Sequence, residues 1–318
     1  MKTTLTKGSI TITTDTYGAE LRSLIMDSRE YLWQGDPVYW TGQAPILFPI
    51  VGSLPQGTCE SAQGPCHMNR HGIARKAEHR LIDQTADSVT YELRSDADTL
   101  KAFPFDFILR MTYTLTHNGG VETRFHVENP GSVPLPFTLG GHPAFNVPIP
   151  LNEAEQAEWD AEADEYDEPE CFEDYELRFS HAFTCRAPLL RDDGLFDLDR
   201  WVTILNDEKT LLLNHYLFRE DALMLSAVPE NTVTLIGRKS DHGLKMDFPG
   251  FEYLGLWQSA CPSPSDGETP APTPFLAIEP WTGHSSNAGD DAVFEHKAGV
   301  HTLKPGESEE LAFTVYPF

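Results

Sequence analysis

Apolar and polar residues alternate in several short stretches of this chain, which is the pattern of β-strands with one buried face. These stretches lie at residues 9–13, 89–94, 108–116, 121–128 and 310–316. Tight-turn sequences stand between them, such as Asn118-Gly119-Gly120 and Asn129-Pro130-Gly131. Glycine tolerates positive φ and proline fixes φ, so these sequences favour sharp reversals of the chain. We therefore expect consecutive strands to be antiparallel.

Helical periodicity is scarce along the chain. Only residues 96–103 and 153–163 carry short helical patterns, so an alternating βαβ architecture is not expected. No repeat and no compositional break divides the chain, although residues 261–274 form a loop rich in Pro and Ser. The pattern predicts an all-β fold, a large antiparallel β-sandwich with long functional loops, and a single domain over residues 1–318.

The charge balance restricts the classes of partner. The chain has 23 Lys and Arg against 49 Asp and Glu, a formal net charge of −26. Such a chain repels nucleic-acid phosphates and anionic lipid, so neither nucleic acid nor membrane is an expected partner. Acidic residues are densest at 151–176, where no Lys or Arg occurs. We interpret this stretch as a solvated insertion and not as a calcium loop, because it lacks the glycine that calcium loops use to turn.

The cysteines and the chain start favour a cytoplasmic protein. Five cysteines form no CxxC pair and are odd in number, which indicates reduced thiols and neither a disulfide framework nor a zinc site. The first residues lack the apolar stretch of a signal peptide, and no apolar run is long enough for a membrane span.

Three segments carry candidate chemistry, and each sets a titratable residue beside Gly or Pro. They are Asn69–Arg75 (NRHGIAR), Leu139–Pro148 (LGGHPAFNVP) and Ala277–Gly283 (AIEPWTG). The imidazoles of His71 and His142 suit proton transfer near neutral pH. Glu279 stands between apolar residues, so burial would raise its pKa toward that of a useful base; a structural ion pair is the alternative.

These segments, in this order, resemble the aldose 1-epimerase (galactose mutarotase) superfamily, and most closely its shorter bacterial branch. The resemblance extends to residues 18–40, 44–54 and 248–258 (FPGFEYLGLWQ), so it runs along nearly the whole chain. It implies a β-supersandwich with a sugar groove. It also implies cofactor-free and metal-free interconversion of the α and β anomers of an aldose, with opening and reclosure of the sugar ring.

The resemblance also implies roles for individual residues. Glu279 matches the general base and His142 the general acid, protonated and opposite the carboxylate. His71 is the third catalytic residue implied, which would hydrogen-bond a sugar oxygen and help to polarise the ring. We further expect substrate contacts from the side chains of Arg75, Asp221, Asn146 and Trp281, with Trp257 a weaker candidate. Asp221, in NHYLFREDALML, is our candidate for the family's sugar-binding aspartate, for which no clear motif is present.

Two alternatives to a free-sugar epimerase remain open at this point. Arg70, Arg75 and Lys76 could form a phosphate pocket for a hexose 6-phosphate, since net charge does not exclude a local cationic site. A non-catalytic sugar-binding protein would keep the groove without turnover. The sequence identifies neither the sugar nor the oligomeric state, which we expect to be a monomer or a homodimer.

Overall fold

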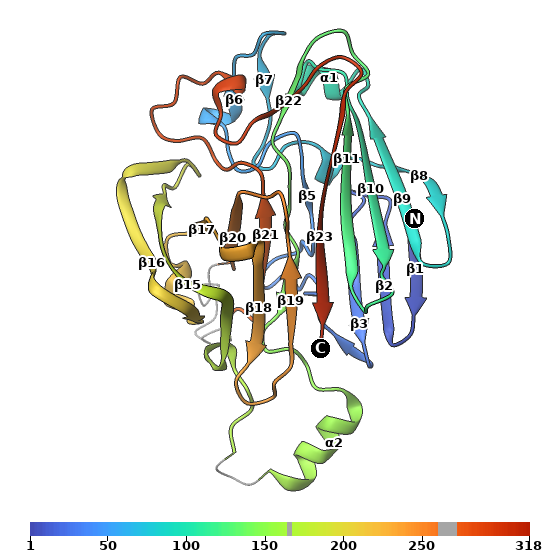
Figure 1. The fold of residues 1–318 in the computed structure, drawn as a ribbon, viewed down its shortest axis with the longest axis vertical. Coiled ribbons are helices and arrows are strands. Elements are labelled where there is room, and N and C mark those ends of the chain that lie inside the picture. The colour runs from blue at the N-terminus through green and yellow to red at the C-terminus, as the bar shows by residue number, and fades with distance from the viewer. Residues whose placement is uncertain (164–166, 260–271) are drawn as a thin grey trace.

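The computed structural model describes residues 1–163, 167–259 and 272–318. Its strands form an antiparallel β-sandwich, which confirms the predicted fold class (Figure 1). The broadest layer is a nine-stranded sheet in the order β16-β15-β18-β19-β23-β11-β10-β9-β8. Its strands are β8 (Arg80–Gln84), β9 (Ser88–Arg94), β10 (Ile108–Leu115), β11 (Val121–Glu128), β15 (Tyr175–Leu190), β16 (Phe196–Leu212), β18 (Thr232–Gly237), β19 (Gly243–Asp247) and β23 (Ser308–Pro317).

Two smaller sheets face this layer. The four-stranded sheet contains β1 (Lys2–Lys7), β2 (Ile10–Asp15), β3 (Leu21–Met26) and β4 (Arg29–Glu30). The six-stranded sheet contains β5 (Ile46–Leu47), β13 (Gly140–Gly141), β14 (Ala144–Asn146), β17 (Leu223–Ser226), β20 (Tyr253–Trp257) and β21 (Phe275–Trp281). Two-stranded pairs join β6 (Thr58–Cys59) to β7 (Cys66–His67), and β12 (Leu135–Phe137) to β22 (His301–Leu303).

Both predicted helices occur, the first shortened to α1 (Thr99–Ala102), the second as α2 (Glu153–Glu162). Short 3-10 turns lie at Pro55–Gly57, Ala74–Lys76, Phe172–Asp174, His215–Phe218, Pro229–Asn231 and Phe294–His296. α2 belongs to the acidic stretch and projects from one end of the sandwich (Figure 1). Asn152 and Glu155 form a capping box at its start. Glu155 also pairs with buried Arg29, so this stretch is anchored to the sandwich as well as solvated.

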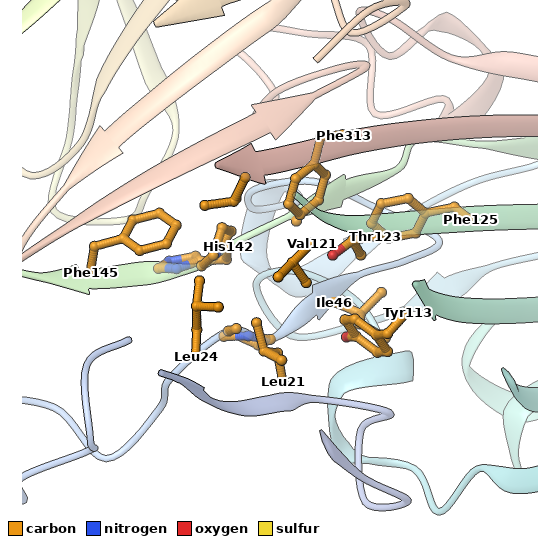
Figure 2. Close-up of a pocket in the computed structure, with 15 residues that line it drawn as sticks. Leu21, Leu24, Ile46, Tyr113, Val121, Thr123, Phe125, His142, Phe145 and Phe313 are labelled. Atoms are coloured by element: carbon orange, nitrogen blue, oxygen red, sulfur yellow. The ribbon is translucent and has the colours of Figure 1, made fainter. Parts of the chain in front are cut away.

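The layers meet in an apolar core that the alternation anticipates. Along β11 every second side chain is buried, beginning with Val121. The core holds a cavity of about 20 Å³. Figure 2 shows the side chains that line it, among them Phe313 from the nine-stranded sheet, Leu24 of β3 and His142. The segment that carries His142 is therefore backed by packed apolar side chains, which fix its position.

Among the described residues, no helix combines the length and the apolar character needed to cross a membrane. The Pro/Ser-rich loop predicted at 261–274 lies, up to residue 271, outside the described residues.

Candidate active site

A cavity of about 230 Å³ collects most of the candidate residues. Glu279 and Trp281 come from β21, the innermost strand of its sheet, and His142 follows β13 directly. Segments remote in sequence also line the cavity, namely the 69–75 segment and the tip of the β15–β16 hairpin. The full lining is Trp40, Gly52, Arg70, His71, Arg75, His142, Leu190, Phe196, Asp221, Ala222, Trp257, Glu279, Trp281 and Ser285.

His142 and Glu279 are in direct contact in this cavity. The Nε2 atom of His142 lies 3.2 Å from Oε1 of Glu279, and both side chains are buried, with 8% and 1% exposed. Indole Nε1 of Trp281 donates a hydrogen bond of 3.2 Å to the other carboxylate oxygen, Oε2. The Glu279 carboxyl is therefore oriented from both sides, with one oxygen toward the imidazole and the other toward the indole.

Burial moves the pKa values of this pair in opposite directions. Removal from water raises the pKa of Glu279 well above its usual value, while the Trp281 hydrogen bond opposes this shift. The same desolvation lowers the pKa of His142 to about 3, and the positive charge of Arg75 adds to the effect. The raised pKa of Glu279 agrees with the sequence analysis. The imidazolium expected for His142 does not, because burial disfavours the charge of either partner.

Aromatic rings fix the imidazole of His142. Its ring centroid lies 5.1 Å from that of Trp40 and 5.4 Å from that of Trp257, and the ring of His71 meets it edge-on at 5.6 Å. Its Nδ1 atom is buried and has no hydrogen-bond partner within the described part of the chain. A proton on Nδ1 would leave a buried donor unpaired, so the geometry favours the neutral tautomer with hydrogen on Nε2.

His71 is held in one tautomer by the main chain. The amide of Gly52 donates to Nδ1 of His71 at 3.2 Å, and the His71 amide donates back to the carbonyl of Gly52 at 2.9 Å. Since Nδ1 accepts, the hydrogen of the neutral ring is on Nε2. Burial lowers the pKa of His71 well below its ordinary value. His71 can therefore donate a hydrogen bond to a ligand without carrying charge.

Local backbone geometry explains why a glycine follows His71. His71 has a φ of 71° and Gly72 a φ of 73°, both in the left-handed region. A Cβ on Gly72 would lie 2.4 Å from the carbonyl oxygen of Phe48. Only glycine fits this close approach, which turns the chain so that His71 and Arg75 line the same cavity.

The two arginines of the 69–75 segment differ in their partners. Arg70 pairs with Asp221 at 3.0 Å and donates from Nε to the hydroxyl of Ser53 at 3.1 Å. Arg75 has no hydrogen bond or ion pair to its guanidinium from the described residues, and burial lowers its pKa. Lys76, the third member of the proposed cationic cluster, is exposed and does not line the cavity.

Most of the predicted site residues meet in this cavity, but Asn146 does not. The side-chain amide of Asn146 donates to the main-chain oxygens of Glu30 and Leu32, so this residue ties β14 to the first sheet.

Sequence reasoning missed the apolar wall of Trp40, Leu190 and Phe196. The last two flank the RDDGL turn of a long hairpin, and nothing in the local sequence shows that its tip reaches the site. Among the described residues, no cluster of three or more His, Cys, Asp or Glu side chains could hold a metal ion.

Comparisons of the sequence and the structure with known proteins identify relatives of this chain. The family model described as Aldose 1-epimerase matches residues 1–313. The chain is similar to plasmid-borne Protein LacX of Lactococcus lactis subsp. lactis, with 35% identity over 315 residues and 96% of each chain covered. Two crystal structures share the fold with TM-scores of 0.83: a galactose mutarotase related enzyme from Lactobacillus acidophilus (27% identity, covering 100% of this chain and 97% of that one) and a galactose mutarotase-like protein from Lactobacillus casei ATCC 334 (29% identity, covering both chains fully).

Proposed function

The chain belongs to the aldose 1-epimerase family, and from this premise we propose that it interconverts the α and β anomers of an aldose by acid–base catalysis. The observation that carries the proposal is the contact of 3.2 Å between His142 and Glu279 inside a cavity of about 230 Å³. A carboxyl group and an imidazole held at one point are the two groups that ring opening requires.

The proposed reaction uses these two side chains in turn. The carboxylate of Glu279 removes the proton from the anomeric hydroxyl, while protonated Nε2 of His142 gives a proton to the ring oxygen. The C1–O5 bond breaks, and the free aldehyde is formed. Rotation about C1–C2 presents the other face of the aldehyde. Glu279, now protonated, then returns its proton to the aldehyde oxygen while His142 takes the proton of the hydroxyl, so the ring closes and the enzyme is restored.

The buried pair already holds the number of protons that the charged state of this reaction needs. A neutral carboxylic acid beside a neutral imidazole holds as many protons as a carboxylate beside an imidazolium. The two states differ only in the place of one proton, which leaves the Glu279 carboxyl and ends on Nδ1 of His142, because Nε2 of the neutral ring already carries hydrogen. A bound sugar supplies hydroxyl groups that solvate the charges, and this favours the charged state once substrate is present.

The remaining lining suits a pyranose. Trp40, Trp257 and Trp281 offer apolar faces for the C–H surface of a sugar ring. His71 donates from Nε2, and the guanidinium of Arg75 adds a fork of donors for hydroxyl groups. Positioning by these groups would supply the rate acceleration that proton transfer alone does not.

A phosphorylated aldose is the second candidate substrate, because Arg75 lines the cavity with its donors unpaired by described residues. The two substrates are separated by measuring anomer exchange of D-galactose, D-glucose and glucose 6-phosphate by NMR exchange spectroscopy. We compare the wild type with Arg75→Gln, and use Lys76→Gln as the matched control because it removes the same charge outside the cavity.

Acceleration of a free sugar by the wild type supports the proposal. A selective loss for glucose 6-phosphate in Arg75→Gln alone would assign the phosphorylated substrate. Binding of these sugars without accelerated exchange would contradict catalysis and favour a sugar-binding protein.

A further inference from the structure

Two free cysteines oppose each other outside the sugar site. Cys59 in β6 and Cys66 in β7 are direct partners in the antiparallel register, and both are buried. Directly opposed residues of such a ladder have Cα atoms about 4.5–5.5 Å apart. A disulfide spans Cα atoms about 4.4–6.8 Å apart. The backbone of this hairpin thus holds the two residues at a separation that a disulfide can bridge.

The two thiols influence each other's ionisation. The neighbouring Cys66 thiol and burial raise the pKa of Cys59, whereas the neighbouring Cys59 thiol lowers the pKa of Cys66. The thiolate is the nucleophile in disulfide chemistry. Cys66, which faces Cys59 across the ladder, is therefore suited to the second step, an attack on a Cys59 that already carries a mixed disulfide.

A cavity of about 320 Å³ opens next to Cys59 and is separate from the sugar site. Cys59 and Lys297 both line it, while Cys66 does not. The amine of Lys297 is buried without a hydrogen-bond partner among the described residues, and burial lowers its pKa to about 7. The charge of Lys297 also favours the thiolate of Cys59. The cavity thus offers an entrance to Cys59 and a group that can accept its proton.

We propose that Cys59 and Cys66 form a redox modification site that is oxidised reversibly to an intramolecular disulfide by a low-molecular-weight disulfide entering this cavity. Access selects Cys59 for the first step, because it lines the cavity and Cys66 does not. Cys59 gives its proton to the amine of Lys297 and attacks the oxidant, which forms a mixed disulfide and releases one thiolate. Cys66 then attacks Sγ of Cys59 and releases the second thiolate. Two protein thiols and one oxidant disulfide become one protein disulfide and two small thiols, so atoms and electrons balance.

The test incubates the full, native chain in mixtures of oxidised and reduced glutathione, followed by acid quenching and alkylation of the remaining thiols. The tryptic peptide from Glu30 to Arg70 contains both cysteines. We expect it to lose the mass of two hydrogens and to resist alkylation. A glutamate-specific protease cuts at Glu60, between the two cysteines, and the fragments should stay joined until a reductant is added.

Three variants make the assignment specific. Cys66→Ser should trap glutathione on Cys59, whereas Cys59→Ser should leave Cys66 unmodified because Cys66 does not line the cavity. Cys185→Ser, which removes another buried thiol, should cross-link like the wild type. The proposal is overturned if the peptide of the natively folded wild type stays fully alkylated at every glutathione ratio, or if Cys66 takes up glutathione in Cys59→Ser.

Discussion

The neutral state that burial imposes on His142 leads to a prediction about its titration. An ordinary histidine with a pKa of 6.5 would be about 97% protonated at pH 5, whereas a pKa of about 3 leaves about 1% protonated. This difference corresponds to about 5 kcal/mol in favour of the neutral ring, taken from the two pKa values at 1.36 kcal/mol per unit. The cause is burial between Trp40 and Trp257, where a charge loses its hydration.

The measurement is the pH titration of ¹⁵N-labelled histidines by long-range ¹H–¹⁵N NMR, with the His142 signals assigned from their absence in His142→Gln. We expect the neutral pattern, with hydrogen on Nε2, from pH 8 down to pH 5. A depressed pKa stabilises the fold above the unfolded value of 6.5, and this stability is lost as the pH falls toward 3. An imidazolium pattern at pH 7, or a titration of His142 near 6.5, would refute the reasoning.

Three further predictions concern residues around this pair. Asn146→Ala should lose about 1–2 kcal/mol of unfolding free energy in urea melts, because two hydrogen bonds are lost. Its epimerase activity should stay within about twofold of the wild type. A large loss of activity in a stably folded variant would show that Asn146 contributes to the site. Gly255→Ala sets a Cβ 2.2 Å from the ring of Trp281, so it should lower the unfolding free energy by about 1–3 kcal/mol. It should also lower kcat, because it displaces the indole that holds Glu279. An unchanged kcat would contradict that role of Trp281. The raised pKa of Glu279 gives the wild type stability that is present below the unfolded pKa of about 4.5 and is lost at higher pH. The unfolding free energy of Glu279→Gln, measured in urea melts relative to that of the wild type, should therefore be higher at pH 8 than at pH 4. The same difference at both pH values would contradict a buried neutral acid.

The alternation of apolar and polar residues was sufficient to locate strands that have one face toward the core and the other toward solvent. The stretch predicted at 121–128 is β11, residue for residue, because one of its faces meets the core and the other meets solvent. The β15–β16 hairpin escaped prediction because many residues along both of its strands are exposed, which leaves no regular alternation. Its tip reaches the cavity around Glu279 through tertiary packing, which local sequence does not encode.

The candidate site residues could be predicted where a sequence motif fixes the backbone. They could not be predicted where contacts with residues remote in sequence determine the orientation or the protonation of a side chain. His142 and Asn146 belong to one motif, but they are four residues apart on a chain that bends into two short strands, and only His142 faces the cavity. Asp221 was chosen by its order in the chain, and it lines the cavity paired with Arg70. The protonation state of His142 depends on burial by aromatic rings that are remote in sequence. Composition and residue spacing therefore could not predict it.

The central claim, catalysis by the His142–Glu279 pair, is tested most directly by the rate of anomer exchange of the preferred sugar in the wild type and in Glu279→Gln. The amide oxygen can still accept from Trp281, so the variant keeps that contact and its volume while it loses the base; its NH2 group then faces Nε2 of His142. The account predicts a loss of about 10²- to 10⁴-fold in kcat with sugar binding retained, and Asn146→Ala as the control near the wild-type rate. Exchange at the wild-type rate in folded Glu279→Gln would contradict it.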